Sequence, residues 1–201
     1  MSVVIEYALL ADGTSDRALL PLIRWALRRA RPEGSFAFQG FEARGGRDLA
    51  GAIQTAIHNY RPTILFVHRD AEGATLEQRR EEIPQRSGVC PIVPVRMTEA
   101  WLLIDEGAVR SAADNPNGSS PLELPSVRRL ESIVDAKATL RELLMSASEN
   151  RGPRRRKRFE KGHSERMQRV AESIPDFRAL LEVPAFARFC ESLDAVLPPP
   201  A

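Results

Sequence analysis

Acidic side chains follow three apolar segments of this sequence, at the points where predicted β-strands end. They are Asp12 and Asp16 after residues 3–10, Asp70 and Glu72 after residues 63–67, and Glu99 after residues 89–95. Because the carboxyl ends of parallel strands lie along one edge of a sheet, where ligands bind, we expect these carboxylates to meet in space. Carboxylates gathered in this way repel one another unless a cation holds them, and oxygen-rich sites suit Mg²⁺ or Mn²⁺. The pattern predicts a metal-dependent enzyme.

Each acidic position also has a structural interpretation. Asp70 and Glu72 are alternate residues of an extended segment, so both can reach one cation, or they form a solvated polar loop. Asp12 and Asp16 flank a helix start, where Asp16 could cap the helix and Asp12 could make the turn. Glu99 precedes a buried segment and could be a metal ligand, a general base or a favourable charge in a first helical turn.

The elements that must position these carboxylates alternate between strands and helices. Residues 35–43 read as a further strand, and helical spacing of apolar residues marks 17–27 and 48–60 as helices. Residues 76–86 read as a charged helix. The connections between strands are too long for hairpins, so we expect an α/β fold with a parallel four-stranded sheet and right-handed crossovers.

The pattern changes after Glu99. Residues 100–105 resemble a short buried helix, and further helices are expected at 135–147, 163–174 and 184–196. The sequence therefore divides into an α/β domain, residues 1–105, and a helical C-terminal region, residues 106–197.

A basic segment lies inside this helical region. Residues 151–161 carry seven basic side chains and one acidic side chain, a local charge of +6 in a chain whose net charge is +2. The candidate nucleic-acid contacts are Arg154, Arg155, Arg156, Lys157, Arg158 and Lys161. Exposed clusters of this kind bind phosphate backbones, and Phe159 beside them could stack on a base. The alternative is a solvated loop between helices.

Composition narrows the class of protein. Apolar residues make up 43% and charged residues 28% of the chain, which is typical of a globular protein. No apolar stretch approaches the roughly 18 residues that span a bilayer, and the N-terminus lacks the features of a signal peptide. Cys90 and Cys190 lack metal-ligand spacing, so we expect both to be reduced and buried. These features favour a cytoplasmic protein without a membrane partner. Lone histidines such as His68 and His163 are expected to be structural or incidental.

The order of the acidic motifs resembles a Toprim domain, in particular that of the OLD-type nucleases. The acidic-Gly-x-x-acidic loop of residues 12–16 precedes the acidic-x-acidic pair Asp70 and Glu72. The chain is similar to an uncharacterised Toprim-like family of bacterial proteins. That family adds a Glu-x-Trp-Leu-x-x-Asp segment, here residues 99–105, and a Lys-Gly element, here Lys161 and Gly162.

The resemblance implies a Toprim or Rossmann-like fold and Mg²⁺-dependent cleavage of nucleic-acid phosphodiesters. Asp70 and Glu72 would hold one metal ion, Asp12 and Asp16 would help to hold a second, and Glu99 would be a ligand or would orient water. It further implies a role in phage defence or mobile-element biology. A separate ATPase would act beside the chain, because the sequence has no phosphate-binding Gly-x-x-x-x-Gly-Lys-Ser/Thr motif.

Two positions depart from the Toprim pattern. Toprim enzymes usually have Glu at the first acidic position and Asp-x-Asp at the later pair, whereas this chain has Asp12 and Glu72. The shorter and the longer side chain could compensate across one metal ion, or they could mark a site that has lost catalysis. The second interpretation leads to an alternative function, a non-catalytic Toprim-like subunit that binds a partner protein, such as an ATPase, or nucleic acid.

Overall fold

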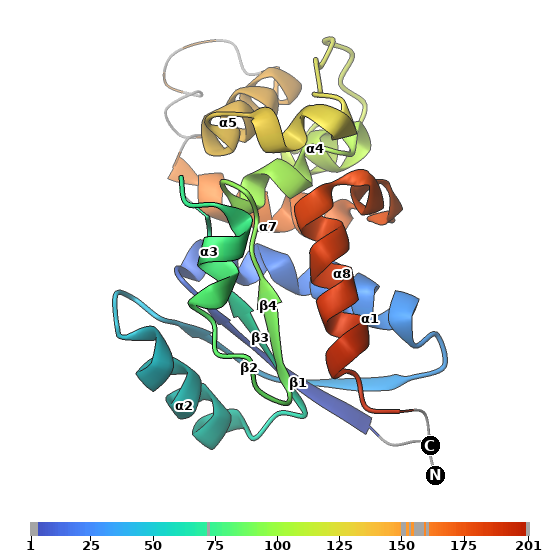
Figure 1. Ribbon diagram of the computed structural model, residues 1–201. Helices are drawn as coiled ribbons and strands as arrows, with labels where there is room; N and C mark the ends of the chain where they lie inside the picture. The colour runs from blue at the N-terminus through green and yellow to red at the C-terminus, as the bar shows by residue number, and fades with distance from the viewer. Residues whose placement is uncertain are drawn as a thin grey trace. The chain divides into compact units, whose positions relative to one another are not determined.

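The computed structural model describes residues 4–71, 73–149, 152, 154, 159 and 161–199. The chain forms two compact units. The first unit combines residues 1–95 with 184–201, and the second comprises residues 96–183. The first unit is α/β and contains the ends of all the predicted strands, and the second is helical (Figure 1).

The α/β unit is built on a four-stranded sheet in which every pair of neighbouring strands is parallel. Its strands are β1 (Val4–Ala11), β2 (Ser35–Ala43), β3 (Ile64–His68) and β4 (Val89–Ile92). Their order across the sheet is β2-β1-β3-β4, so β2 and β4 are the edge strands. The predicted α/β fold with a parallel four-stranded sheet flanked by helices is confirmed.

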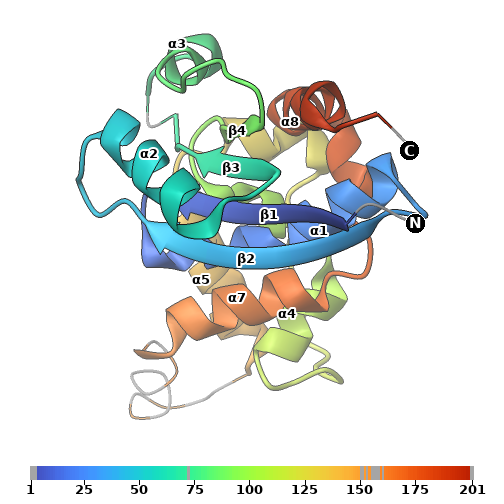
Figure 2. The same cartoon turned by 90° about the horizontal axis from the view of Figure 1, so that it is seen from below.

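Helices connect these strands and cover both faces of the sheet (Figure 2). They are η1 (Thr14–Ala18), α1 (Leu19–Ala30), α2 (Leu49–Tyr60), α3 (Leu76–Glu81) and α8 (Pro184–Val196). Pro21 lies in the first turn of α1, where its missing N–H group costs no intrahelical hydrogen bond. The charged helix α3 ends at Glu81, before the predicted end at residue 86, because Pro84 follows and disfavours helical backbone before it.

Strand alternation divides the core of this unit between the two faces. On the face covered by α1 and α8, the Phe66 ring of β3 packs edge-on against Tyr7 of β1 and Phe189 of α8. On the other face, Leu65 and Val67 are buried together with Ile53 of α2. Because neighbouring residues of a strand point to opposite faces, β3 is buried on both sides and is continuously apolar until His68.

The pairing of β1 with β2 contains one irregularity. Tyr7 pairs with Phe38, but the next residue, Ala8, pairs with Gly40, so Gln39 is an extra residue in β2. This bulge places Gly40 on the α2 face, where the Tyr60 ring lies against it. A Cβ atom on Gly40 would overlap the Tyr60 ring, so a larger residue at this position would have to displace that ring.

The second unit is assembled from short helices. They are η2 (Thr98–Leu102), α4 (Glu106–Ala112), η3 (Val127–Ser132), α5 (Ala136–Ala147), α7 (His163–Ser173) and η4 (Arg178–Glu182). The helices predicted at 135–147 and 163–174 are confirmed, and Asp135 caps α5 through its side chain. In the part of the chain that the structure describes, no helix is long and apolar enough to cross a membrane.

Candidate functional site

The candidate site lies where the strand order of the sheet changes direction. From β1 the chain moves to β2 on one side and then returns to β3 on the other side of β1. The carboxyl ends of β1 and β3 are therefore neighbours from which the connections leave in opposite directions. Such switch points are where open α/β sheets bind ligands. Asp12 follows β1 at this point, and β3 ends beside it at His68, followed by Arg69 and Asp70.

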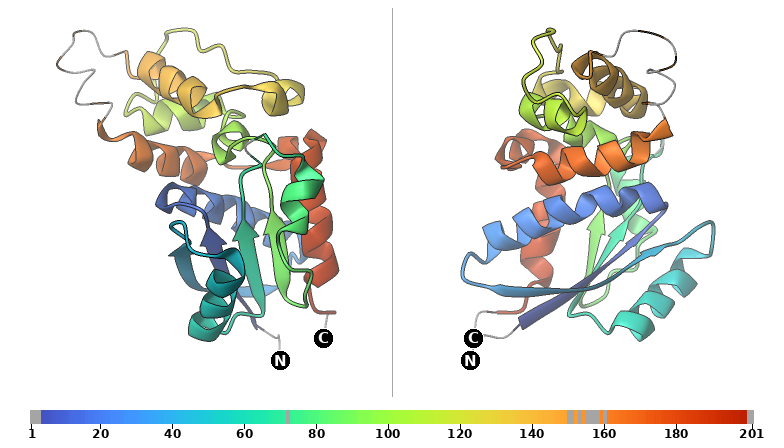
Figure 3. Two further views of the ribbon diagram at one scale, coloured as in Figure 1. Left: turned by 60° about the vertical axis from the view of Figure 1, so that its left-hand side comes forward. Right: turned by 180° about the vertical axis from the view of Figure 1, so that it is seen from behind.

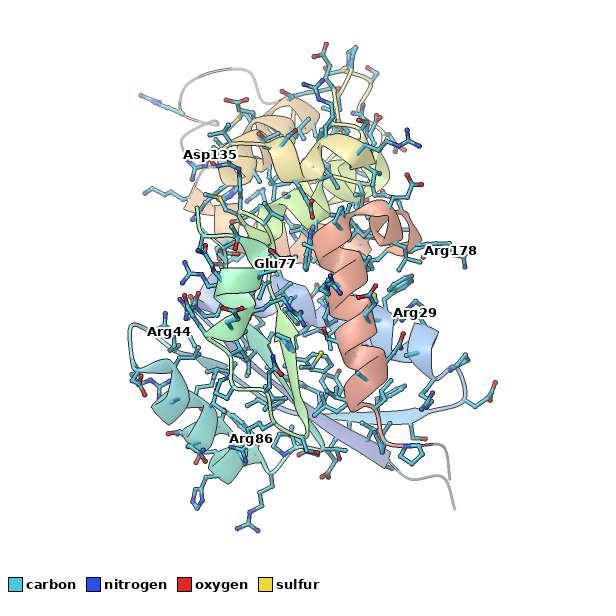
Figure 4. The ribbon with its side chains drawn as sticks, viewed as in Figure 1. Arg29, Arg44, Glu77, Arg86, Asp135 and Arg178 are labelled. Atoms are coloured by element: carbon cyan, nitrogen blue, oxygen red, sulfur yellow. The ribbon has the colours of Figure 1, made fainter. Side chains whose placement is uncertain are left out.

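Asp12 is held by two arginines. The Nε and Nη2 atoms of Arg44 each lie 2.9 Å from Oδ1 of Asp12, and Nε of Arg69 lies 3.1 Å from Oδ2. Arg44 follows β2 and Arg69 follows β3, so this carboxylate joins the ends of three strands; Figure 4 labels Arg44. Both carboxylate oxygens of Asp12 are therefore engaged by guanidinium groups.

The ion pairs continue away from Asp12 along the edge of the sheet. Nη1 of Arg69 lies 2.8 Å from Glu82, and the same carboxylate accepts from Nη1 of Arg79 at 2.9 Å. Arg47 pairs with Glu42 at 2.7 Å. Each carboxylate in these contacts therefore has at least one arginine as its partner.

Asp16 and Asp70 are joined through His68. The imidazole is wholly buried, with Nδ1 3.3 Å from Oδ2 of Asp16 and Nε2 3.1 Å from Oδ1 of Asp70. Asp16 Oδ2 also accepts a hydrogen bond from the backbone N–H of Gly13 at 2.8 Å. Burial alone would lower the pKa of His68. Both carboxylates accept hydrogen bonds from the imidazole and carry negative charge, and these two effects together raise the pKa to about 10. At neutral pH His68 is an imidazolium between two carboxylates.

These contacts explain how three carboxylates share one end of the sheet. Asp12 pairs with Arg44 and Arg69, and Asp16 and Asp70 share the single positive charge of His68. The two groups are joined by the consecutive residues 68–70. The expected meeting of Asp12, Asp16 and Asp70 is found, and the cations around them belong to the protein itself.

The donor atoms at this site suit Mg²⁺ or Mn²⁺ in chemistry, but they differ in access. Asp70 keeps one carboxylate oxygen, Oδ2, without a hydrogen-bond partner among the described residues, and its side chain is 20% exposed. Asp12, in contrast, has both oxygens engaged. Within the described ranges, no three His, Cys, Asp or Glu side chains are arranged to hold a metal ion. Glu72, the predicted second ligand beside Asp70, lies outside these ranges, so the ligand set of Asp12, Asp16, Asp70 and Glu72 stays a prediction.

The remaining predicted residues belong to the second unit or lie outside the described residues. Glu99 is buried in the first turn of η2, and its catalytic role stays a prediction. Arg154 and Lys161 are exposed, as expected of phosphate contacts. Residues 155–158, with the other predicted contacts Arg155, Arg156, Lys157 and Arg158, lie outside the described part of the chain.

One expectation about the basic segment is wrong. Phe159 is buried, and the guanidinium of Arg166 lies over its ring at 3.9 Å from the ring centre. A ring covered by a cation inside the helical unit is not available to stack on a base. Phe159 therefore serves packing, and a cation–π contact with Arg166 holds it in place.

Sequence reasoning missed the cations of the site. His68 was expected to be a lone structural histidine, and Arg44 and Arg69 were assigned nothing. One signal was available, because His-Arg-Asp is a run of three polar residues directly after the wholly apolar segment of β3. Consecutive residues at a strand end point to alternate faces, so such a run can contact carboxylates on both sides.

Comparison of this chain with models of known protein families, with curated proteins and with solved structures finds no match.

Proposed function

We propose that this protein hydrolyses nucleic-acid phosphodiesters with Mg²⁺ or Mn²⁺ bound at Asp70 and Glu72. The observation that supports the proposal is the convergence of Asp12, Asp16 and Asp70 at the switch point between β1 and β3. Asp70 in this cluster keeps one carboxylate oxygen without a hydrogen-bond partner among the described residues, and carboxylate oxygens suit Mg²⁺ or Mn²⁺. The resemblance to Toprim domains points to the same reaction.

The residues of this chain divide the work of such a reaction. Asp70 offers an accessible oxygen, while His68 holds its other oxygen and fixes the carboxylate. Arg44 and Arg69 present guanidinium groups beside them, and a guanidinium matches the geometry of a phosphate. A bound divalent cation would polarise the phosphoryl oxygen and favour ionisation of a water molecule. Water adds to phosphorus, one P–O ester bond breaks, and the leaving oxygen takes up a proton.

A cleavage assay tests this proposal. Labelled single-stranded and duplex DNA and RNA are incubated with the protein and Mg²⁺ or Mn²⁺, and products are separated on a denaturing gel. We expect Asp70→Asn, which keeps the volume but removes the charge, to abolish cleavage. The control is Glu33→Gln, an exposed carboxylate in the connection between α1 and β2. Equal cleavage by wild type and Asp70→Asn would contradict the assignment.

The same site favours a second candidate function through one specific observation. Arg44, Arg69 and His68 already pair with three of the carboxylates, as expected of a structural ion-pair network. The corresponding function is a non-catalytic subunit that binds nucleic acid or a partner protein such as an ATPase. Nucleic-acid binding by the wild type without metal-dependent cleavage of any of the four substrates would favour this candidate.

A further inference from the structure

One aromatic ring is exposed on the sheet of the α/β unit. Phe38 of β2 is 40% exposed, and it is the only aromatic among the exposed large apolar side chains of the described residues. The ring is supported on one side by its cross-strand neighbour, because Tyr7 of β1 lies 5.4 Å away between ring centres. A supported, solvent-facing ring on an edge strand is a surface on which another flat ring can stack.

The bulge at Gln39 adds a third phenylalanine to the face that carries Phe38. Residues paired across parallel strands point to the same face. The pairs on this face are Ile5 with Phe36, Tyr7 with Phe38 and Leu9 with Phe41. Without the extra residue, Phe41 would point to the opposite face from Phe36 and Phe38. The bulge therefore aligns three phenylalanines along β2 over roughly 17 Å, at about 3.3 Å per residue.

Three arginines accompany this row of rings. The guanidinium of Arg17 lies over the Phe41 ring, 5.7 Å from its centre. Arg24 and Arg28 are one turn apart on α1 and therefore share a face of the helix. Both lie close enough to Tyr7 for their charges to act on its hydroxyl: burial raises the pKa of Tyr7, and the two arginines oppose that rise. Figure 3 shows α1 on this side of the sheet.

The charges of these arginines are not compensated. Arg17, Arg24 and Arg28 are exposed, and none forms an ion pair with a carboxylate of the described residues. Arg29, the neighbour of Arg28, is instead paired with Asp194 of α8 at 3.0 Å; Figure 4 labels Arg29. The α1 helix thus carries both an arginine paired with α8 and two unpaired arginines whose charges act on Tyr7, the neighbour of Phe38.

We infer that this arginine–phenylalanine face binds single-stranded nucleic acid. The face consists of Arg17, Arg24, Arg28, Phe36, Phe38 and Phe41. Unpaired guanidinium groups attract phosphates, and the exposed Phe38 ring can stack on a base, while Phe36 and Phe41 are half-buried beside it. A base offers its face in this way only when the strand is unpaired. An acidic protein would satisfy the arginines but would not need a row of rings, so the combination favours a nucleic-acid strand.

The position of the face connects it with the candidate site. Phe41 lies near the end of β2, and Arg44, which follows that strand, binds Asp12. A strand bound along β2 would therefore lead toward the carboxylates at the switch point. In this respect the inference deepens the proposed function, because the bound strand would be the substrate that is cleaved. Only this identification rests on the proposed function, since binding itself is independent of cleavage.

The test is fluorescence anisotropy with a fluorescein-labelled 15-nucleotide oligothymidylate, in EDTA, over a series of salt concentrations. We expect the full-length wild type to bind, and the triple variant Arg17→Gln, Arg24→Gln, Arg28→Gln to bind more weakly. Its log–log salt slope should fall by roughly 2, because each lost phosphate contact on a single strand removes about 0.7. Arg29→Gln, on the same helix, is the matched control and should retain the wild-type slope.

A second variant separates stacking from charge. Phe38→Leu keeps an apolar side chain but removes the ring, and we expect about tenfold weaker binding at an unchanged salt slope, within the range known for base stacking. Thermal unfolding followed by circular dichroism verifies that each variant is folded. An unchanged affinity in both the triple variant and Phe38→Leu would overturn the inference.

Competitors identify the occupant. An unlabelled duplex of the same length, or a polyglutamate peptide, should compete poorly with the labelled strand. Competition by either as effective as that of unlabelled oligothymidylate would overturn the assignment to single strands. Binding is measured in EDTA, so it does not depend on metal-dependent cleavage. Wild-type cleavage by Asp70→Asn would contradict the proposed function alone. Wild-type binding by the triple variant and by Phe38→Leu would contradict this inference alone.

Discussion

The Nε atom of Arg69 lies 3.1 Å from Oδ2 of Asp12, and this ion pair joins the end of β3 to the end of β1. Both side chains are mostly buried, with 13% and 27% of their side-chain surface exposed. Arg44 reaches the other oxygen of the same carboxylate from the end of β2. The ends of three strands are therefore tied to one aspartate, and that arrangement gives the carboxyl edge of the sheet a defined geometry.

A double-mutant cycle measures the coupling between these two residues. We expect Asp12→Asn and Arg69→Met each to destabilise the protein, because each leaves a partly buried charge with fewer partners. The double variant should be less destabilised than the sum of the two single variants, with a coupling of about 1 kcal/mol in urea unfolding. Additive effects would mean that the ion pair contributes nothing to stability.

We expect His68 to make the free energy of unfolding fall as the pH rises above 6.5. Its pKa is raised from 6.5 to about 10 in the folded protein, so the native state binds the extra proton between these values. The contribution of the His68 ion pairs to the free energy of unfolding is fully present below pH 6.5. It is lost as the pH rises toward 10, at up to about 1.4 kcal/mol per pH unit. Urea unfolding in metal-free buffer should show this decline in the wild type and a smaller decline in His68→Gln.

An independent measurement avoids the need for a stable variant. Histidine side-chain NMR signals of the wild type should include one imidazole that does not titrate between pH 5.5 and 8. Titration of all three histidines near pH 6.5 would contradict the structure around His68.

Gly40 and Gly51 should respond in opposite ways to the same substitution. Gly40→Ala places a Cβ atom 2.0 Å from the Tyr60 ring, and we expect a loss of about 1–3 kcal/mol in the free energy of unfolding. Gly51→Ala lies in α2, where the nearest atom would be 3.4 Å away, and should stabilise by up to about 1 kcal/mol. Equal effects of the two substitutions would show that Tyr60 does not pack against β2.

The two thiols should be inert in the folded protein. Cys90 and Cys190 are free and buried, as predicted from the sequence. Burial raises the pKa of Cys90 far above its usual range and that of Cys190 to about 11, so neither forms a thiolate at neutral pH. Reaction with Ellman's reagent at pH 7.5 should be slow until denaturant is added. Rapid labelling of the native protein would contradict this packing.

Hydrophobic spacing predicted the sheet because β1 and β3 are apolar segments that end in polar residues, and connections long enough for helices exclude hairpins. The same reasoning placed Asp12 and Asp70 at strand ends. It could not identify their partners, since contacts of His68 and Arg69 depend on the strand order across the sheet. Spacing along the chain does not specify that order.

The bulge in β2 was also beyond sequence reasoning. A strand of nine residues reads as a regular alternation, in which Phe36 and Phe38 share a face and Phe41 does not. The extra residue becomes visible only in the pairing with β1, where Gly40 must accommodate Tyr60. Contacts between elements distant in sequence therefore determined the aromatic face, as they did the cations of the site.

The central claim is that Asp70 helps to hold a divalent cation. Isothermal titration calorimetry with Mn²⁺ tests it most directly, on wild type, Asp70→Asn and the control Glu33→Gln. We predict binding to the wild type and the control with equal affinity, and at least about tenfold weaker binding to Asp70→Asn, a change of about 1.4 kcal/mol. Equal Mn²⁺ affinity in all three proteins would contradict the proposed metal site.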